Sequence, residues 1–600
     1  MSASLSIVAL PFKNLSPNED YDYYCDGITD SIIQALSSIN RLKVISKTST
    51  FYFKDKTLSL TEIAQKLQVS HVLEGSIRIA DKQLKVNVNL VDAESDFSLW
   101  SQSWKRDLSQ IFEVEDEICL KVAEKLREHA GHLDLEESLV SAPTPTLAAY
   151  EKYLIGQKLF NKWNPQDVSR AIEELEQALK LDPNLLQAHI ALADAYSFMA
   201  VTAFAPVEEA LQKSDSYLQQ AKQLDPNSAE LNYLLANDAF FREANYAKAF
   251  QYSLKSIQTK PTYIDSQRFL IFLYLLNDQV EKAKEHLFYA KSVDPLGAET
   301  SFYEGYYYYR TENYEAAKQI MQALLAENSS NIPAITIYLY ILILRKEFDE
   351  LQNYLNSIPE MMLIPDERLG MEALLKLETK AESFQSAFEK VKTNASKQTS
   401  KQADSYLYLL LVRQGKLEEA FKVAERIFTH QSSIIMLHFG DPLAKEARNS
   451  AQFTALHKRI FSLAVSEPQK VQKKSSELQA AETKEAIEKL QHHLTEEQSY
   501  LNPQLSLRLL AQEIGLHPNQ LSWLLNEKMG KNFNEFINIY RIAHFKQIAA
   551  KSENAHISII GLAFESGFNS KSVFNTFFKK TEGITPKTYL SQLKQSSSDL

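Results

Sequence analysis

The stretch LAQEIGLHPNQLSWLLNEKMG, residues 510–530, recurs in altered form as LAFESGFNSKSVFNTFFKKTEG, residues 562–583. Equivalent positions lie 52 residues apart at the start of the two copies and 53 apart at their ends. In each copy a short apolar helical pattern leads to a glycine, and a second amphipathic helical pattern follows. This layout predicts two helix-turn-helix units, a motif whose second helix enters the major groove of DNA.

The residues around the first copy supply the signals that begin and end helices. Ser506 is a candidate N-cap for a helix over 507–514, and Gly515 permits the turn. Pro518 suits the first turn of the next helix, where a missing N–H costs nothing. The apolar spacing over 532–551 predicts a long helix, which we expect to connect the two units rigidly.

Polar and aromatic residues remain on the outward faces of the two second helices. We expect base contacts from these residues and phosphate contacts from two lysines near the end of the second copy. The predicted base-reading residues are Asn519, Ser522 and Trp523 in the first copy and Lys571, Ser572, Asn575 and Thr576 in the second; the phosphate-binding lysines are Lys579 and Lys580. The alternative is that these are merely exposed residues of a packed helical bundle.

One register of matching residues runs through the last hundred positions. It comprises Leu507, Gly515, Leu521, Gly530-Lys531-Asn532-Phe533, Tyr540-Arg541, Ile559, Ala563, Gly567-Phe568, Ser572, Phe574, Phe577-Phe578-Lys579-Lys580, Gly583, Thr585-Pro586 and Tyr589. This pattern resembles the AraC/XylS DNA-binding domain over residues 499–597. The resemblance implies an all-α domain with two helix-turn-helix units that enter successive major-groove segments. Two positions depart from the family: Trp523 stands where arginine is common, and Ser566 where an apolar residue is preferred.

Residues 1–135 mix strand and helix patterns and predict a small α/β domain. Residues 72–79 and 84–91 form a candidate hairpin around Asp81-Lys82, and Thr61 is a candidate N-cap for a helix over 60–67. The segment resembles the TolB-like amino-terminal domain of some bacterial regulators and adenylate cyclase-like proteins. The matching residues are Ile7-Val8-Ala9-Leu10-Pro11-Phe12, Asn14-Leu15-Ser16, Asp26-Gly27-Ile28-Thr29, Val44-Ile45-Ser46, Leu73-Glu74-Gly75-Ser76 and Leu99-Trp100.

Residues 145–465 are predicted to be helices joined by short turns. A proline recurs at Pro183, Pro226, Pro261 and Pro295, with spacings of 43, 35 and 34 residues. The last two spacings are close to the period of about 34 residues of tetratricopeptide (TPR) repeats, which the array resembles. Small residues such as Gly156 and Gly305 stand where paired helices must approach. We expect an α-solenoid that receives a protein or peptide partner.

Composition and charge limit the remaining possibilities. Residues 466–498 are predicted to be a polar linker that becomes helical. Residues 501–600 carry a net charge of +4 and the whole chain −11, so a basic module accompanies an acidic body. Two cysteines in 600 residues offer no disulfide framework, and we find no signal peptide or apolar run long enough for a membrane helix. A cytoplasmic location is therefore expected.

No enzyme motif is complete in the chain. Gly415-Lys416 lacks the spacing of a phosphate loop, and His492-His493 are adjacent and diverge on a helix. Some of the rings of Tyr306–Tyr309 are expected to fill the core between helices rather than form a ligand cage. We expect no catalytic residue, cofactor or metal. The sequence predicts a non-enzymatic, sequence-specific transcription regulator that binds double-stranded DNA, with a homodimer over direct half-sites as one arrangement. The rival hypotheses are a TPR scaffold without DNA binding and an accessory protein of nucleotide-cyclase-type signalling.

Overall fold

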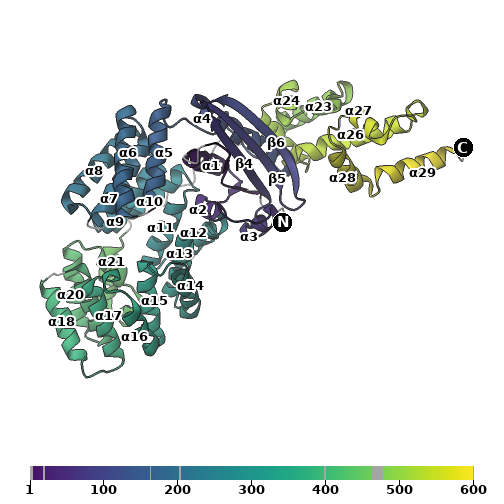
Figure 1. Ribbon diagram of the computed structural model, residues 1–600. Coiled ribbons are helices and arrows are strands. Elements are labelled where there is room, and N and C mark those ends of the chain that lie inside the picture. Colours follow the sequence, from purple (N-terminus) through teal and green to yellow (C-terminus); the bar gives the residue numbers. More distant parts are fainter. Residues whose placement is uncertain are drawn as a thin grey trace. The chain divides into compact units, whose positions relative to one another are not determined.

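The computed structural model describes residues 5–17, 21–162, 164–201, 204–397, 400–462 and 477–598 (Figure 1). The chain divides into two compact units. The first comprises Met1–Val44, Leu58–Ser141 and Val471–Leu600, and the second comprises Ile45–Thr57 and Ala142–Lys470. The amino-terminal sheet domain and the carboxy-terminal helices therefore share one unit, and the solenoid forms the other.

A mixed sheet forms the centre of the amino-terminal domain. Its strands follow the order β3-β1-β4-β5-β6, and β2 also pairs with β4. Strand β1 is parallel to β3 and β4, whereas β4, β5 and β6 are antiparallel. The strands are β1 (Ser6–Ala9), β2 (Lys13–Asn14), β3 (Lys43–Val44), β4 (His71–Ala80), β5 (Gln83–Asp92) and β6 (Phe97–Asp107). The α/β prediction is confirmed, although the sequence did not indicate β6 as a full strand.

Local sequence signals account for the turns and helices of this domain. Asp81 and Lys82 both have positive φ, the conformation that a two-residue hairpin turn requires, so the predicted hairpin is confirmed. Helix α3 (Leu60–Leu67) has the predicted bounds, but the N-cap prediction was wrong: Ser59, not Thr61, is the N-cap and forms a capping box with Glu62. Helices α1 (Asp22–Ser37) and α4 (Ile111–Ala130) pack against each other, and α4 also contacts β5 and β6.

The second unit is a series of helix pairs in which consecutive helices pack together (Figure 1). The helices are α5 (Leu147–Phe160), α6 (Pro165–Leu181), α7 (Leu186–Val201), α8 (Val207–Leu224), α9 (Ala229–Phe241), α10 (Tyr246–Thr259), α11 (Ile264–Leu276), α12 (Val280–Val293), α13 (Ala298–Arg310), α14 (Tyr314–Glu327), α15 (Ile332–Arg345), α16 (Phe348–Ser357), α17 (Pro365–Glu378), α18 (Phe384–Lys397), α19 (Lys401–Arg413), α20 (Leu417–Thr429), α21 (Ile434–His438) and α22 (Ala451–Ile460). The predicted helical solenoid is thereby confirmed.

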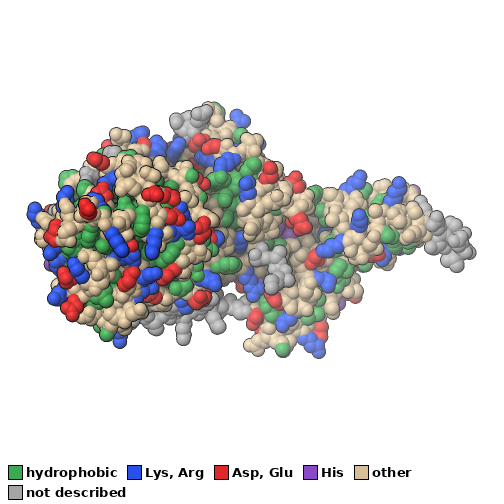
Figure 2. All heavy atoms as spheres, turned by 90° about the horizontal axis from the view of Figure 1, so that it is seen from below, with side chains coloured by type: hydrophobic (Ala, Val, Ile, Leu, Met, Phe, Trp, Pro, Cys, Tyr) green, Lys and Arg blue, Asp and Glu red, His purple; other side chains and the backbone are tan. Residues whose placement is uncertain are grey.

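Small and aromatic residues fill the contacts between paired helices. A Cβ on Gly156 would lie 2.6 Å from Leu175 Cγ, too close without a shift of Leu175, and one on Gly305 would lie 2.7 Å from Met321 Cε, at the flexible end of that side chain. Tyr306 and Tyr309 are buried, as expected for core aromatics. On the face shown in Figure 2, Lys and Arg side chains are interspersed with Asp and Glu, and no large region of one sign stands out.

A short segment early in the chain is built into the solenoid. Helix α2 (Lys47–Phe51) follows directly after β3, and Ser46 N–H donates to Val293 O at 2.7 Å. The fully buried carboxylate of Asp294 accepts the hydroxyls of Ser46, Ser49 and Thr300 and pairs with Arg268. A buried carboxylate without hydrogen-bond partners is costly, so these bonds hold the segment within the second compact unit.

The carboxy-terminal helices complete the first unit. They are α23 (Ala480–Glu496), α24 (Leu507–Glu513), α25 (Pro518–Trp523), α26 (Phe533–Ala549), α27 (Ile559–Glu565), α28 (Lys571–Glu582) and α29 (Pro586–Ser598). Of the predicted linker over 466–498, residues 466–476 lie outside the described residues, and α23 accounts for most of the remainder. In the described parts of the chain, no helix is both long and apolar enough to cross a membrane.

A buried histidine near the end of the solenoid predicts a pH dependence of stability. Burial lowers the pKa of His438 to about 4, and its ring contacts Tyr340 Oη at 2.7 Å and the Ser405 hydroxyl. An unfolded histidine titrates near pH 6.5. Between pH 6.5 and 4 the unfolded chain therefore binds a proton that the folded chain excludes, so stability is lost as the pH falls. From pH 7.5 to 5 we expect a loss of about 2 kcal/mol from this residue.

Urea unfolding of the full chain at the two pH values, followed by hydrogen exchange of α19 and α21, measures this loss. His438→Gln should remove most of it, whereas His430→Gln, at an exposed position of the same unit, should leave it unchanged. Equal pH dependence in both variants would contradict the assignment.

Candidate nucleic-acid interface

Two helix-turn-helix units follow each other in the carboxy-terminal domain. The first consists of α24 and α25, and the second of α27 and α28. As predicted, Ser506 caps α24 by accepting Leu509 N–H, and Pro518 begins α25. Helix α25 is short and continues into a π-helical turn, η6 (Leu524–Lys528). Both turns contain a glycine with positive φ, Gly515 at 71° and Gly567 at 90°.

Helix α26 contributes to the cores of both units. Its first half supplies Phe533, Phe536 and Ile537 to the core around α24 and α25. Its second half supplies Phe545 and Ile548 to the core around α27 and α28. Because one continuous helix supports both cores, the two units are held in a defined relation to each other. The expected rigid connection is therefore present.

Arg541 on α26 bonds to the loop that precedes α24, and this loop also contacts the second helix-turn-helix unit. Its Nε donates to Tyr500 O at 2.8 Å, and its Nη2 donates to Asn502 O at 2.9 Å. Burial lowers the pKa of Arg541 to about 10, so the guanidinium remains charged at neutral pH. The same loop contacts the turn of the second unit, because a Cβ on Gly567 would lie 2.3 Å from Tyr500 O.

The outward face of α28, in the second helix-turn-helix unit, is exposed to solvent. Lys571, Ser572, Thr576 and Lys579 are exposed, and Asn575 is half-buried. Phe574 and Phe578 are fully buried on the opposite face. Lys580 is also exposed but forms an ion pair with Glu535 at 2.9 Å. The structure thus presents the predicted residues of the second copy together on one accessible surface.

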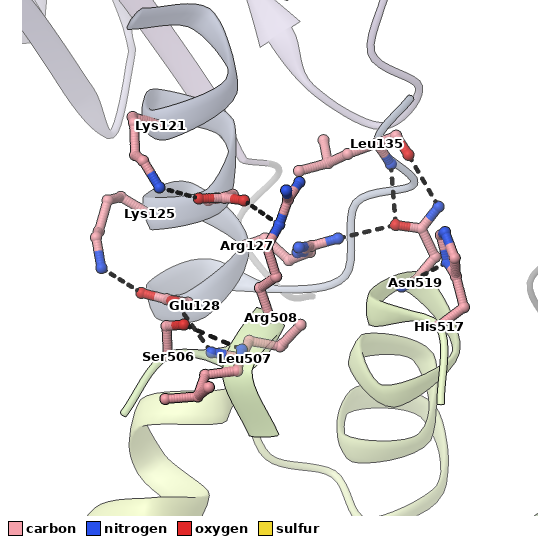
Figure 3. A network of polar contacts seen from close by, with 12 residues as sticks. Lys121, Lys125, Arg127, Glu128, Leu135, Ser506, Leu507, Arg508, His517 and Asn519 are labelled. Carbon is pink, nitrogen blue, oxygen red and sulfur yellow. Dashed lines mark hydrogen bonds and ion pairs between the residues drawn. The ribbon is translucent and has the colours of Figure 1, made fainter. Parts of the chain in front are cut away.

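The predicted reading face of α25 is covered. Ser522 is fully buried and Trp523 is 7% exposed, whereas the sequence led us to expect both on an outward surface. Arg127, at the carboxyl end of α4, and Leu135 bond to Asn519 (Figure 3), and His132 contacts Ser522. No local sequence pattern indicates this contact, because its partners are separated by more than 380 positions. Trp523 is buried for another reason: it packs in the hydrophobic core of the carboxy-terminal domain itself.

Asn519 lies at the centre of the contact. Its Oδ1 accepts Arg127 Nη1 at 2.8 Å and Leu135 N–H at 3.2 Å, and its Nδ2 donates to Leu135 O at 3.1 Å (Figure 3). Burial lowers the pKa of Arg127 to about 10, which leaves it charged. Nearby, His132 Nδ1 lies 3.0 Å from Ser522 Oγ. Burial lowers the pKa of His132, so its ring is neutral above pH 7.

Two carboxylates of α4 contact the start of α24. Glu128 Oε1 accepts the buried N–H of Leu507 at 3.1 Å, and Glu124 Oε1 pairs with Arg508 Nε at 2.8 Å. Each carboxylate also forms an ion pair with a lysine of α4. Lys121 Nζ lies 3.0 Å from Glu124 Oε2, and Lys125 Nζ lies 2.6 Å from Glu128 Oε2. The polar groups of α24 and α25 that face α4 are therefore engaged within the protein.

Further features of the domain are structural. Asn532, the N-cap of α26, donates to His129 O at 2.9 Å. Ser566 is fully buried, and its hydroxyl donates to Leu562 O at 2.7 Å, which satisfies the polar group at this departure from the family pattern. Over the ranges that the structure describes, no three His, Cys, Asp or Glu side chains come close enough to hold a metal ion.

Comparison with known families supports this description of the domain. Residues 510–592 match the family model described as a helix-turn-helix domain. Residues 2–120 match the second domain of HilA/YgeH-like transcriptional regulators. The carboxy-terminal domain is a helix-turn-helix domain of the AraC type, and it follows a domain found in transcriptional regulators. The resemblance of residues 1–135 to TolB-like domains stays a prediction.

Curated relatives match parts of the chain. Over 243 residues it is 30% identical to a protein of Rhizobium meliloti (strain 1021) named, with a qualifier, adenylate cyclase 3; the match covers 39% of this chain and 40% of that protein. Over 99 residues it is 28% identical to the regulatory protein PocR of Salmonella typhimurium, covering 16% of this chain and 32% of PocR. The chain thus spans less than half the length of these relatives.

Among solved structures, a tetratricopeptide repeat protein from Parabacteroides merdae aligns along its entire length with 48% of this chain. The identity is 11% and the TM-score 0.29. At this TM-score the two molecules do not superpose closely. The description of the solenoid therefore rests on its own helix pairs.

The two turn glycines predict unequal effects of the same substitution. Gly515→Ala places a Cβ in open space, so its cost is the positive φ alone, about 1–2 kcal/mol. Gly567→Ala carries a similar cost and also forces the Cβ against the backbone of Tyr500 and Leu501. We expect an additional destabilisation of about 1–3 kcal/mol from overpacking. Hydrogen exchange of α24 and of α27 in the full chain measures each cost locally, and equal protection losses would contradict this packing.

Proposed function

We propose that the protein is a DNA-binding transcription regulator whose carboxy-terminal domain reads duplex DNA. The observation that carries this proposal is the exposed face of α28 on a two-unit helix-turn-helix framework. Lys571, Ser572, Asn575 and Thr576 lie on this face, where side chains of a recognition helix meet base edges. The family matches and the regulatory name of PocR support the same conclusion.

The chemistry of the face suits the two kinds of contact that a DNA reader makes. An asparagine amide can hydrogen-bond adenine through both its donor and its acceptor, and hydroxyls can bond several base edges. Lys579 is exposed near the end of α28 and supplies the charge that neutralises a phosphate. For Lys580 the ion pair with Glu535 must exchange for a phosphate contact.

The other parts of the chain have less specific assignments. We assign the solenoid the capture of a protein or peptide partner and the amino-terminal domain the reception of a signal, in a cytoplasmic regulator. Pairing of two chains over direct half-sites would add affinity by avidity without new base contacts. No catalytic residue, cofactor or metal has a role in this proposal. Before Asn519 and Ser522 can read bases, their contacts with residues 127–135 must separate. Trp523 packs in the domain core, so base reading by this residue would also require it to leave that core.

A second candidate is a signalling accessory or scaffold that binds no DNA. The observation that favours it is the similarity to a protein named for adenylate cyclase over 243 residues. That match covers 40% of the relative, so the name does not transfer to this chain. The two candidates differ in one measurable property, sequence-selective binding of duplex DNA.

Selection of the full chain against a pool of random-sequence duplexes tests the proposal. We expect enrichment of a defined sequence. On that sequence Asn575→Ala should cost about 1–3 kcal/mol, with little effect on a scrambled duplex, because it removes base contacts. Lys579→Ala should weaken binding to both duplexes equally and reduce the salt slope by about 1, because it removes one phosphate contact.

The matched control is Lys422→Ala, which removes one exposed positive charge from α20 of the solenoid. It should leave both affinities within error of the unmodified chain. Selection without enrichment, or identical effects of Asn575→Ala and Lys422→Ala, would contradict DNA reading by α28 and favour the scaffold.

A further inference from the structure

The two helix-turn-helix units differ in accessibility although they share one design. The reading face of α28 is exposed, whereas that of α25 lies beneath the carboxyl end of α4 and residues 131–135. Trp523 packs in the core of the carboxy-terminal domain and gives no evidence for this contact. Ser522 has no exposed surface, and the Asn519 amide is bonded to Arg127 and Leu135. A base pair cannot reach side chains that are buried in this way. The first helix-turn-helix unit must therefore separate from α4 before it can read DNA.

The carboxyl end of α4 and residues 131–135, here called the cover, reproduce the hydrogen bonds that a base would make with Asn519. An asparagine recognises adenine by accepting from its amino group and donating to its ring nitrogen. Here the peptide groups of Leu135 supply the same pair: its N–H donates to Asn519 Oδ1 at 3.2 Å, and its C=O accepts from Nδ2 at 3.1 Å. Arg127 donates a further bond to Oδ1 at 2.8 Å. The amide of Asn519 is thus occupied in both of its roles.

The cover also supplies negative charge where a DNA backbone would. Phosphate contacts in protein–DNA complexes come from backbone N–H groups and from arginine side chains. At the start of α24 these groups bind carboxylates instead: Leu507 N–H donates to Glu128, and Arg508 pairs with Glu124 (Figure 3). Both carboxylates project from adjacent turns of α4 and are nearly buried.

We propose that α4 and residues 131–135 act as an intramolecular imitation of DNA that holds the first helix-turn-helix unit closed. Leu135 stands in for a base edge, and Glu124 and Glu128 stand in for backbone phosphates. A duplex and α4 then exclude each other on this face, while α28 stays available. This inference rests on the proposed function and assigns its regulation: whatever draws α4 away from α24 and α25 converts a one-unit reader into a two-unit reader.

The cover is anchored in the domain that we assign to signal reception. Helix α4 packs on β5, β6 and α1, and Ile118 and Val122 of α4 are fully buried. Residues 124–135 therefore move with the amino-terminal domain, and any rearrangement of that domain changes the cover directly. The carboxylates and the groups they bind belong to different ends of the chain, so the contact is made only in the folded protein.

Glu124→Arg in the full chain tests the cover without altering the DNA-reading domain. It places two positive charges against each other at Arg508 and should release α24 and α25. The matched control is Glu113→Arg, which makes the same charge change at an exposed position on the same helix, bonded only to Gln110 in the contacts described. His132→Ala is a second release variant, which removes the contact to Ser522 without changing the charge of α4.

The first measurement is hydrogen exchange without DNA. We expect amides of α24 and α25 to exchange at least about tenfold faster in Glu124→Arg and in His132→Ala than in the unmodified chain, with α28 unchanged. Glu113→Arg should match the unmodified chain. Equal exchange in all four proteins would overturn the cover, whether or not α28 reads DNA.

The second measurement is binding to the duplex enriched from the random pool. The release variants should bind at least about tenfold more tightly than Glu113→Arg, with a steeper salt slope from the added phosphate contacts. Their footprint should extend by about one helical turn, the spacing of successive major-groove segments. An unchanged footprint with faster exchange would overturn the imitation of DNA. Failure of every protein to bind selectively would instead overturn the proposed function and leave the exchange result standing.

Discussion

The sharing of α26 between two hydrophobic cores is the constraint on which the DNA-reading account depends. Neither α24 with α25 nor α27 with α28 is long enough to enclose a core alone. Phe536 and Ile537 complete the first core, and Phe545 and Ile548 complete the second. Because these side chains project from one helix, the two helix-turn-helix units cannot rotate independently of each other. The relation between α25 and α28 is thus set by packing, before any DNA is bound.

Polar satisfaction explains why the first unit rests against α4. The amide of Asn519, the N–H of Leu507 and the guanidinium of Arg508 would each need water or a ligand on an open surface. In the closed arrangement they bond to Leu135, Glu128 and Glu124. Buried polar groups without such partners are costly. In our proposal the same groups also bind DNA, and the exchange of carboxylates for phosphates then needs little net change in hydrogen bonding.

The sequence predicted what short-range patterns encode. Ser506, Gly515 and Pro518 lie where capping and turn chemistry require them, the hairpin turns at Asp81-Lys82, and the solenoid follows from repeated helix pairs. The true N-cap of α3, Ser59, required the capping box with Glu62 to be recognised. The placement of the second reading face also followed from its periodicity, although the roles of its residues stay predictions. The cover on Asn519 could not be predicted, because no local pattern joins residues 127–135 to a helix near position 520.

The most direct test of DNA reading is a structure of the full chain bound to the duplex that it selects. The account predicts α28 in the major groove, with Asn575 facing base edges and Lys579 near a phosphate. A duplex bound to another surface, with the outward face of α28 left in solvent, would contradict it.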